Sequence, residues 1–365
     1  PQPKKARTKP ASAQELIERL RSDEDIEVND ARVSGVSTPE WNALLDRPMT
    51  FLLPKNKNKD ARQTDWKNGT STFAYWLVGG PDGALSRHLR KASKGFFPLV
   101  FGGAAKIEGW TRRTANGMKT IDCLVLDSDA GDSLFDVKDR LAALGLAALL
   151  YTSYSDQKSV SHFPHDKVLR HLRIDRDPTD DEMRAFLAGK FRDHVLSTIS
   201  VAGTEHTEDG LQIIVTHTPI EKFRVIVPLA EVLEIMSLAG ASGTQKAAQL
   251  AVAQKVRGLA KLIGLKLDES CTDVSRAFYM PSHPQGAEWE LEILRGRGVT
   301  LEELEDVAKD MGQPSHRTRK RDDRTLCGMP LEMYAAIYAH RLELARLLED
   351  HCPERVREVK GSVLV

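Results

Sequence analysis

A strand-helix-strand pattern at residues 119–153 constrains the fold of this chain more than any other feature of its sequence. The apolar runs TIDCLVL at residues 120–126 and LAALLYT at residues 146–152 predict two strands. Between them, Asp132 or Ser133 caps a helix that continues to Leu144 and ends at Gly145. Such a βαβ unit makes a right-handed crossover onto a parallel pair of strands. Because neither strand alternates with polar residues, we expect both in the centre of a sheet.

The composition is that of a soluble globular protein and not of a disordered, collagen-like or membrane-spanning chain. The sequence has 365 residues, 52 Lys and Arg against 52 Asp and Glu, and 41% hydrophobic residues. A net charge of zero means that any nucleic-acid contact has to come from local basic clusters. The four cysteines form no CxxC pair, which argues against a zinc ribbon or a secreted disulfide framework. No apolar stretch resembles a signal or a membrane span, so we expect a cytoplasmic protein.

The pattern along the chain predicts four parts. Residues 1–11 are basic and proline-rich, as in a flexible arm. Residues 12–311 predict one α/β or α+β domain, which opens with a small α/β layer and carries a polar, histidine-rich insertion at about 156–210. In that layer we expect a helix at residues 13–21 and a second helix that starts at Thr38 and Pro39. A basic linker at 312–328 precedes a helical C-terminal region at 329–365.

Two aspartates stand at the end of the first strand of the βαβ unit. In an extended backbone Asp127 and Asp129 point to the same side, with Cα atoms roughly 6 to 7 Å apart, so both carboxylates can hold the same hard cation. Ligands of such sheets gather beyond the carboxyl ends of the strands, where this pair stands. The alternative is a solvated loop in which one aspartate caps the next helix.

A histidine and two cations form the second candidate feature. His217 stands in a predicted turn, Thr216 to Pro219, between strands expected at 213–215 and 223–227. An imidazole at a strand end, with Lys222 and Arg224 close in sequence, can donate to phosphate oxygens. The alternative is an ordinary surface histidine.

The third feature follows a long amphipathic helix expected at 244–263. The segment LDESCTDVSRAFYMPS at residues 267–282 offers two further acidic residues, Asp268 and Asp273, and the cation Arg276 just ahead of a strand at 276–280. Either aspartate could also cap a turn.

These three features, in this order, resemble the motifs of the archaeo-eukaryotic primase superfamily, in particular the primase-polymerase domains of phage and plasmid replication proteins. The family has a strand-borne DxD or DxE, a small-x-His element and a later hydrophobic-Asp element. Here they match Asp127 and Asp129, then His217, then Asp268 or Asp273. The flanking segments YTSYS, THTP, KFRVIVPL and LDESCTDVSRAFYMPS are also similar, and the resemblance covers about residues 30–285.

The chain departs from the family pattern in two places. Some sixty residues separate YTSYS from His217, whereas these elements are nearly adjacent in the family. The insertion contains a second Ser-His pair with His162, but we prefer His217 because only that histidine is followed by an apolar strand. Of the two later aspartates we favour Asp268, which follows an apolar leucine as in the family, and we expect Asp273 to orient Arg276.

The resemblance implies a primase-polymerase core with an RNA-recognition-motif-like βαβ sheet, and a DNA primase or polymerase that makes or extends primers on single-stranded DNA. Catalysis would use Asp127, Asp129 and Asp268 to hold two Mg²⁺ or Mn²⁺ ions, with Asp273 as the other candidate ligand. The residues implied for nucleotide binding are His217, Lys222, Arg224 and Arg276.

Local basic patches are the expected contacts to the backbone of the template. They are Arg87, Arg90, Lys91, Arg112 and Arg113. The expected partners are single-stranded DNA, nucleoside triphosphates and a replicative helicase, and we expect a monomer.

Three other interpretations predict different results. A catalytically silent replication initiator with a primase-like fold would bind DNA without incorporating nucleotides. A relaxase would form a covalent phosphotyrosine adduct, but the sequence has no His-hydrophobic-His strand. A DxD glycosyltransferase would use sugar nucleotides and is disfavoured because the chain shows no secretory signal.

Overall fold

The structure is a computed structural model that describes residues 12–28, 31–55, 66–78, 98–107, 110–284, 286–304, 325–326 and 329–330. The chain divides into two units, Pro1–Asp310 and Met311–Val365. In the second unit, β16 (Thr325–Leu326) pairs antiparallel with β17 (Met329–Pro330). The predicted basic arm and nearly all of the predicted linker and C-terminal helices lie outside the described residues. No helix among the described residues has the length and apolar character needed to cross a membrane.

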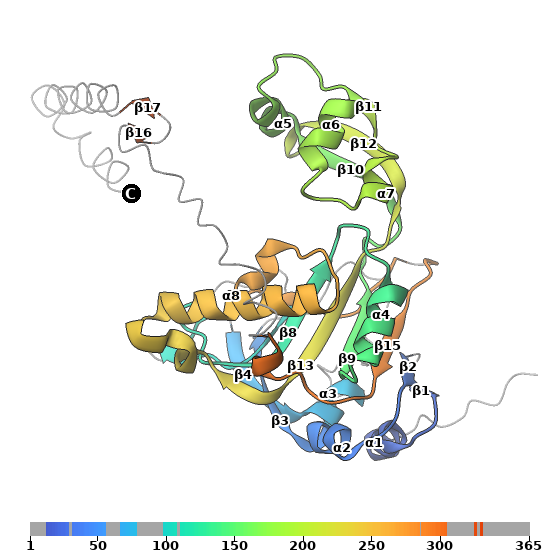
Figure 1. Ribbon diagram of the computed structural model, residues 1–365, viewed down its shortest axis with the longest axis vertical. Coiled ribbons are helices and arrows are strands. Elements are labelled where there is room, and N and C mark those ends of the chain that lie inside the picture. The colour runs from blue at the N-terminus through green and yellow to red at the C-terminus, as the bar shows by residue number, and fades with distance from the viewer. Residues whose placement is uncertain are drawn as a thin grey trace, which may run out of the picture. The chain divides into compact units, whose positions relative to one another are not determined.

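The first unit has an α+β architecture built on a six-stranded sheet in the order β1-β2-β15-β9-β13-β8 (Figure 1). The predicted βαβ unit is present as β8 (Thr120–Ser128), α4 (Leu134–Ala143) and β9 (Ala148–Thr152). The expected pairing of its two strands is wrong, because β13 (Phe223–Glu234) lies between them, antiparallel to both. The apolar run at 223–229 is buried on both faces, except for the half-buried Arg224, and therefore takes the central position, where both edges find partners.

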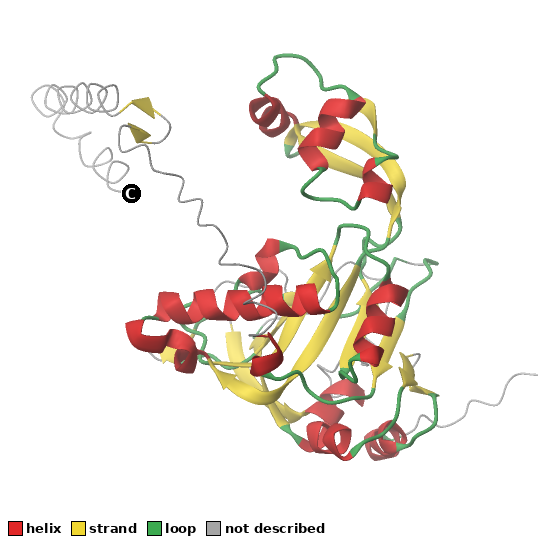
Figure 2. Cartoon of the chain, in the orientation of Figure 1, coloured by secondary structure: helices red, strands yellow, loops and turns green. Residues whose placement is uncertain are grey.

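Two helices cover one face of this sheet (Figure 2). Helix α4 packs on β9 and on β15 (Leu291–Leu294), and α8 (Gln245–Leu262) packs on β8 and on the short 3-10 helix η2 (Glu269–Thr272). A second 3-10 segment, η1 (Ile235–Ser242), leads into α8. The far edge of the sheet consists of β1 (Ile26–Val28) and β2 (Ala31–Ser34). One continuous apolar core joins these elements.

The predicted N-terminal α/β layer is confirmed in its helices. Helix α1 (Ala13–Arg21) starts with a capping box from Ser12, and α2 (Pro39–Asp46) has Thr38 as its cap and Pro39 in its first turn. Beside them lie α3 (Phe73–Val78) and a sheet in the order β14-β5-β3-β4. Its strands are Phe278–Tyr279, Pro98–Phe101, Pro48–Pro54 and Trp66–Thr72. The hairpin of β6 (Lys106–Ile107) and β7 (Trp110–Thr111) completes the layer.

The insertion forms a small module with its own core, which we call the insertion module and define as residues 158–220. It contains β10 (Lys158–Pro164), α5 (His165–Leu172), α6 (Asp180–Leu187), α7 (Asp193–Leu196), β11 (Ser200–Thr207) and β12 (Gly210–Ile220). The predicted turn at 216–219 is wrong, and so is the predicted end of the insertion near residue 210. Strand β12 runs through both points because it pairs with β10 and β11 on its two edges and buries Ile220 in the module's core.

A buried carboxyl in β8 makes the stability of the core depend on pH. Asp122 is fully buried, and among the described residues its carboxylate accepts one hydrogen bond, from the backbone N–H of Thr50 (3.3 Å), which leaves Oδ1 without a partner there. Burial raises the pKa of Asp122 to about 6, against the opposing effects of the Thr50 hydrogen bond and the charge of Arg47. Because this pKa is raised in the folded state, the contribution of Asp122 to stability is fully present at acidic pH and is lost as the pH rises through about 6.

We therefore expect Asp122→Asn to remove this pH dependence. Between pH 4 and 7.5 the free energy of unfolding of the unsubstituted protein should fall by up to about 3 kcal/mol relative to that of the variant. Urea titrations at several pH values measure the difference. Parallel pH profiles for the two proteins would mean that Asp122 ionises normally in the fold.

Candidate functional site

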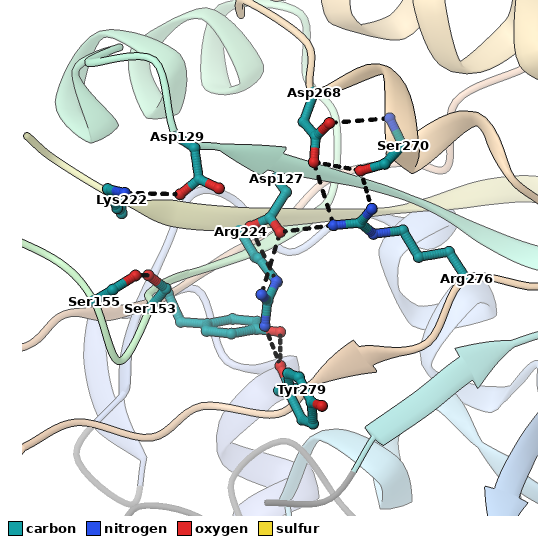
Figure 3. A network of polar contacts seen from close by, with 11 residues as sticks. Asp127, Asp129, Ser153, Ser155, Lys222, Arg224, Asp268, Ser270, Arg276 and Tyr279 are labelled. Carbon is teal, nitrogen blue, oxygen red and sulfur yellow. Dashed lines mark hydrogen bonds and ion pairs between the residues drawn. The ribbon is translucent and has the colours of Figure 1, made fainter. Parts of the chain in front are cut away.

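Three carboxylates from distant parts of the chain meet at one end of the six-stranded sheet. Asp127 is the second-last residue of strand β8, Asp129 directly follows the strand, and Asp268 is the N-cap of η2. One oxygen from each lies within 4.8 Å of the others, and Figure 3 shows the three side chains converging. Asp127 is buried, whereas Asp129 and Asp268 are half-exposed. The site therefore consists of one buried carboxylate, Asp127, and two carboxylates that a ligand can reach, Asp129 and Asp268.

Arg224 holds Asp127 from the neighbouring strand. The two residues are register partners on β13 and β8, and the guanidinium contacts both carboxylate oxygens, at 3.1 Å from Nε and 3.2 Å from Nη2. Its Nη1 donates to the carbonyl of Tyr279 (2.7 Å). Burial raises the pKa of Asp127, the charge of Arg224 opposes this, and the charge of Asp129 adds to it. Arg224 is thus committed to the aspartate and the backbone beneath the acidic cluster.

Arg276 links two of the three carboxylates. Its Nη2 lies 3.5 Å from Oδ2 of Asp127 and 3.3 Å from Oδ2 of Asp268, and its guanidinium lies over the ring of Phe278 at 5.5 Å. Partial burial acts to raise the pKa of Asp268, but hydrogen bonds from Ser270 and the charge of Arg276 hold it below its usual value. The Asp268 carboxylate is therefore ionised at neutral pH.

The second candidate for the third carboxylate lies elsewhere. The Oδ1 of Asp273 accepts hydrogen bonds from the backbone N–H (2.8 Å) and the hydroxyl (2.9 Å) of Ser275, as a turn cap does. Its backbone carbonyl accepts from the N–H of Arg276 (3.0 Å). Asp273 shapes the turn that carries Arg276, and the structure groups Asp268, not Asp273, with the first two aspartates.

Lys222 is the predicted nucleotide-binding residue that pairs with Asp129. Its Nζ lies 3.6 Å from Oδ1 of Asp129, and Figure 3 shows this pair beside the other two carboxylates. With Arg224 and Arg276 it brings three cations to three anions, which offsets the mutual repulsion of the carboxylates.

His217 lies in β12 of the insertion module and not at the end of the six-stranded sheet where the carboxylates meet. Its Nδ1 donates to the carbonyl of Thr218 (2.7 Å), so its Nε2 accepts from the hydroxyl of Ser161 (2.9 Å) when the ring is neutral. The ring is buried and lies 5.8 Å from that of Phe191. In this state the histidine has no donor left for a phosphate, and it contributes to the module's packing.

The predicted DNA contacts are placed only in part. Arg113 donates to the carbonyl of Ser275 (3.0 Å) and lies over the ring of Trp66 at 5.0 Å. Arg112 is also in the described part of the chain, whereas Arg87, Arg90 and Lys91 fall outside it. The DNA-binding role of all five stays a prediction.

A junction behind the acidic cluster is the feature that sequence reasoning missed. Asp132, predicted only as a possible helix cap, is buried and accepts from Nε (2.8 Å) and Nη2 (2.5 Å) of Arg192 in the insertion module. It also accepts from the hydroxyl of Ser128 (3.1 Å) and the backbone N–H of Lys266 (3.1 Å). One carboxylate therefore joins the loop between β8 and α4, the insertion module and the segment that leads to Asp268.

The junction requires a glycine in the loop. Gly131 has φ of +90°, and a Cβ at this position would meet Cγ2 of Val195 in α7 at 2.6 Å. Any larger residue at position 131 would collide with α7, so the glycine allows the insertion module to pack against this loop.

The donor set suits a hard divalent cation. Three carboxylates within 4.8 Å provide the oxygen ligands that Mg²⁺ and Mn²⁺ prefer, and no soft ligand lies in this cluster. No family model, no curated protein and no solved structure matches this chain. Functional inference therefore depends on the chemistry of the site.

Proposed function

We propose that this chain is a template-directed nucleotidyltransferase that makes or extends primers on single-stranded DNA in phage or plasmid replication, with a core of the primase-polymerase type. The observation that carries the proposal is the meeting of Asp127, Asp129 and Asp268, which are separated by up to 141 positions in the chain (268 minus 127). The βαβ arrangement of β8, α4 and β9 around β13 gives support, because its strand ends form a ligand-binding edge.

The proposed reaction forms a bond between a 3′-hydroxyl oxygen and the α-phosphorus of an incoming nucleotide, and it breaks the bond to the pyrophosphate oxygen. Asp127, Asp129 and Asp268 would hold Mg²⁺ or Mn²⁺. When bound, the metal lowers the pKa of the attacking hydroxyl and neutralises charge on the phosphates. Arg224 fixes the orientation of Asp127, and Lys222 offers an ammonium beside Asp129.

The silent replication initiator is the second candidate. It is favoured by the ion pairs of Arg276 with Asp127 and Asp268, because a guanidinium between two carboxylates can replace a cation. The two candidates differ in one measurable property, since only the enzyme incorporates nucleotides.

The test uses the full chain, a single-stranded template and labelled nucleotides, with and without an annealed primer. We expect incorporation that requires Mg²⁺ or Mn²⁺ and stops on chelation. Ribo- and deoxyribonucleotides are supplied in separate reactions, because both triphosphates would compete for the same metal ions and cationic side chains. Salt-sensitive binding to single strands without incorporation under any of these conditions would replace the enzyme by the silent initiator.

A further inference from the structure

The tripeptide Lys-Phe-Arg occurs twice around the acidic cluster, at residues 190–192 and 222–224. In both copies the phenylalanine is buried in a core, Phe191 in the insertion module and Phe223 in the main sheet. The arginine of each copy binds an aspartate in the segment of residues 127–132, which spans the end of β8 and the loop after it. Arg224 pairs with Asp127 and Arg192 pairs with Asp132. The two tripeptides thus contact the same segment, residues 127–132, from two modules.

The lysines of the two copies share one electrostatic neighbourhood. Lys222 lies 3.6 Å from Asp129, as described above. The Nζ of Lys190 lies over the rings of Phe163 (5.0 Å) and Phe191 (5.7 Å), which hold the ammonium in place. Burial lowers the pKa of Lys190 and the charge of Lys222 lowers it further, while the carboxylates of Asp129 and Asp268 raise it. The charge of Lys190 therefore acts on the acidic cluster.

Hydrogen bonds fix the segment around Lys190 to the loops of the site. The backbone N–H of Arg192 donates to the carbonyl of Ala130 (2.9 Å), and Nη2 of Arg192 donates to the carbonyl of Gly264 (2.8 Å). From the other side, Nζ of Lys266 donates to the carbonyl of Phe191 (2.5 Å). Lys190 therefore lies in an exposed turn between α6 and α7 whose next two residues are fixed to the loops of the site.

We propose that Lys190 is a nucleotide-binding residue, whose ammonium binds the triphosphate of the incoming nucleotide together with Lys222. This inference rests on the proposed function. A triphosphate needs cations besides the metal, but Arg224 and Arg276 are paired with the carboxylates. Among the described residues, no carboxylate lies within ion-pair distance of Lys190, so its charge is available to a ligand.

The proposal gives the insertion module a place in the active site. Sequence reasoning assigned the phosphate contact to His217, whose ring packs near Phe191 in the core of the module. In the proposed site His217 supports the segment that carries Lys190, and the lysine makes the contact. The insertion module then provides both the phosphate contact, through Lys190, and the packing that supports it, through His217.

The test measures equilibrium binding of ATP and of dATP to the full chain by calorimetry, in Ca²⁺ to prevent turnover. We expect Lys190→Ala to raise the dissociation constant of both nucleotides by about tenfold, which is about 1.4 kcal/mol, because the triphosphate is common to them. Lys190→Arg should stay within about threefold of the unsubstituted protein, since it keeps the charge. Inorganic tripolyphosphate should compete with dATP for the unsubstituted protein and about tenfold less well for Lys190→Ala.

Lys246→Ala is the matched control. Lys246 is an exposed lysine at the start of α8, whose 18 residues place it roughly 25 Å from the loop at Gly264, so its removal should leave the dissociation constant unchanged. Equal affinities of Lys190→Ala and the unsubstituted protein would overturn the proposal, and so would the absence of any binding. Binding that depends on Lys190 in a chain that incorporates no nucleotide would support this site and reject the polymerase.

Discussion

Asp129→Asn is expected to lower metal-dependent nucleotide incorporation by at least about a thousandfold, or about 4 kcal/mol of transition-state stabilisation. The amide removes a charged ligand from the cluster but fills almost the same volume. The side chain of Asp129 is 45% exposed and pairs only loosely with Lys222, at 3.6 Å. Because an exposed pair of this kind contributes little to folding, the unfolding temperature should stay within a degree or two of its original value.

The same substitution at Asp127 is a poorer test of catalysis. Asp127 is the counter-ion of Arg224, whose guanidinium is nearly buried, and removing one partner of a buried ion pair costs about 3 to 5 kcal/mol. Asp127→Asn should therefore lose both activity and stability. The contrast between the two variants separates the chemistry of the cluster from its role in the fold.

Asp273→Asn is the control, because it makes the same change of aspartate to asparagine at a carboxylate outside the acidic cluster. Its Oδ1 accepts hydrogen bonds from Ser275, and an asparagine oxygen can accept the same two bonds. Activity should remain within a fewfold of the original. Full activity in Asp129→Asn, or a thousandfold loss in Asp273→Asn, would reject the assignment of the three carboxylates. Initial rates at saturating nucleotide and template provide the comparison.

The sequence predicted the pair of Asp127 and Asp129 from local patterns, whereas the arrival of Asp268 beside them depends on the fold. Apolar runs define β8 and β9, a Ser133 cap starts α4, and alternation along β8 places Asp127 and Asp129 on one side. The position of β13 between the two strands depends on competition between three apolar strands for the central place. That competition is decided by tertiary packing, which no local pattern describes.

The core of the insertion module and its contact with the loop after β8 are not visible in the sequence pattern. The sequence predicts only a polar, histidine-rich insertion here, but its buried residues make a separate core and its Arg192 binds Asp132. The repeated Lys-Phe-Arg was visible in the sequence. The sequence does not show that both copies contact residues 127–132. The contact of Arg192 with Asp132 joins residues 60 positions apart (192 minus 132) and is a property of the fold.

Arg192→Met is expected to lower the free energy of unfolding by about 3 kcal/mol, because it leaves the carboxylate of Asp132 buried without its cation. Only the hydroxyl of Ser128 and the N–H of Lys266 would still donate to it. Methionine keeps most of the aliphatic length of the arginine, so the loss of packing is small. Urea denaturation at pH 7 measures the change.

The double variant Asp132→Asn, Arg192→Met separates stability from positioning. Replacing both charged partners removes the uncompensated charge, so at least about half of the lost 3 kcal/mol should return. The affinity for dATP should stay low in both variants, because the side-chain bonds from Arg192 to Asp132 and to the carbonyl of Gly264, which help to fix the segment of Lys190, are lost in both. If the double variant recovered both stability and nucleotide affinity, the junction would only hold the fold together, and Lys190 would reach its ligand without it.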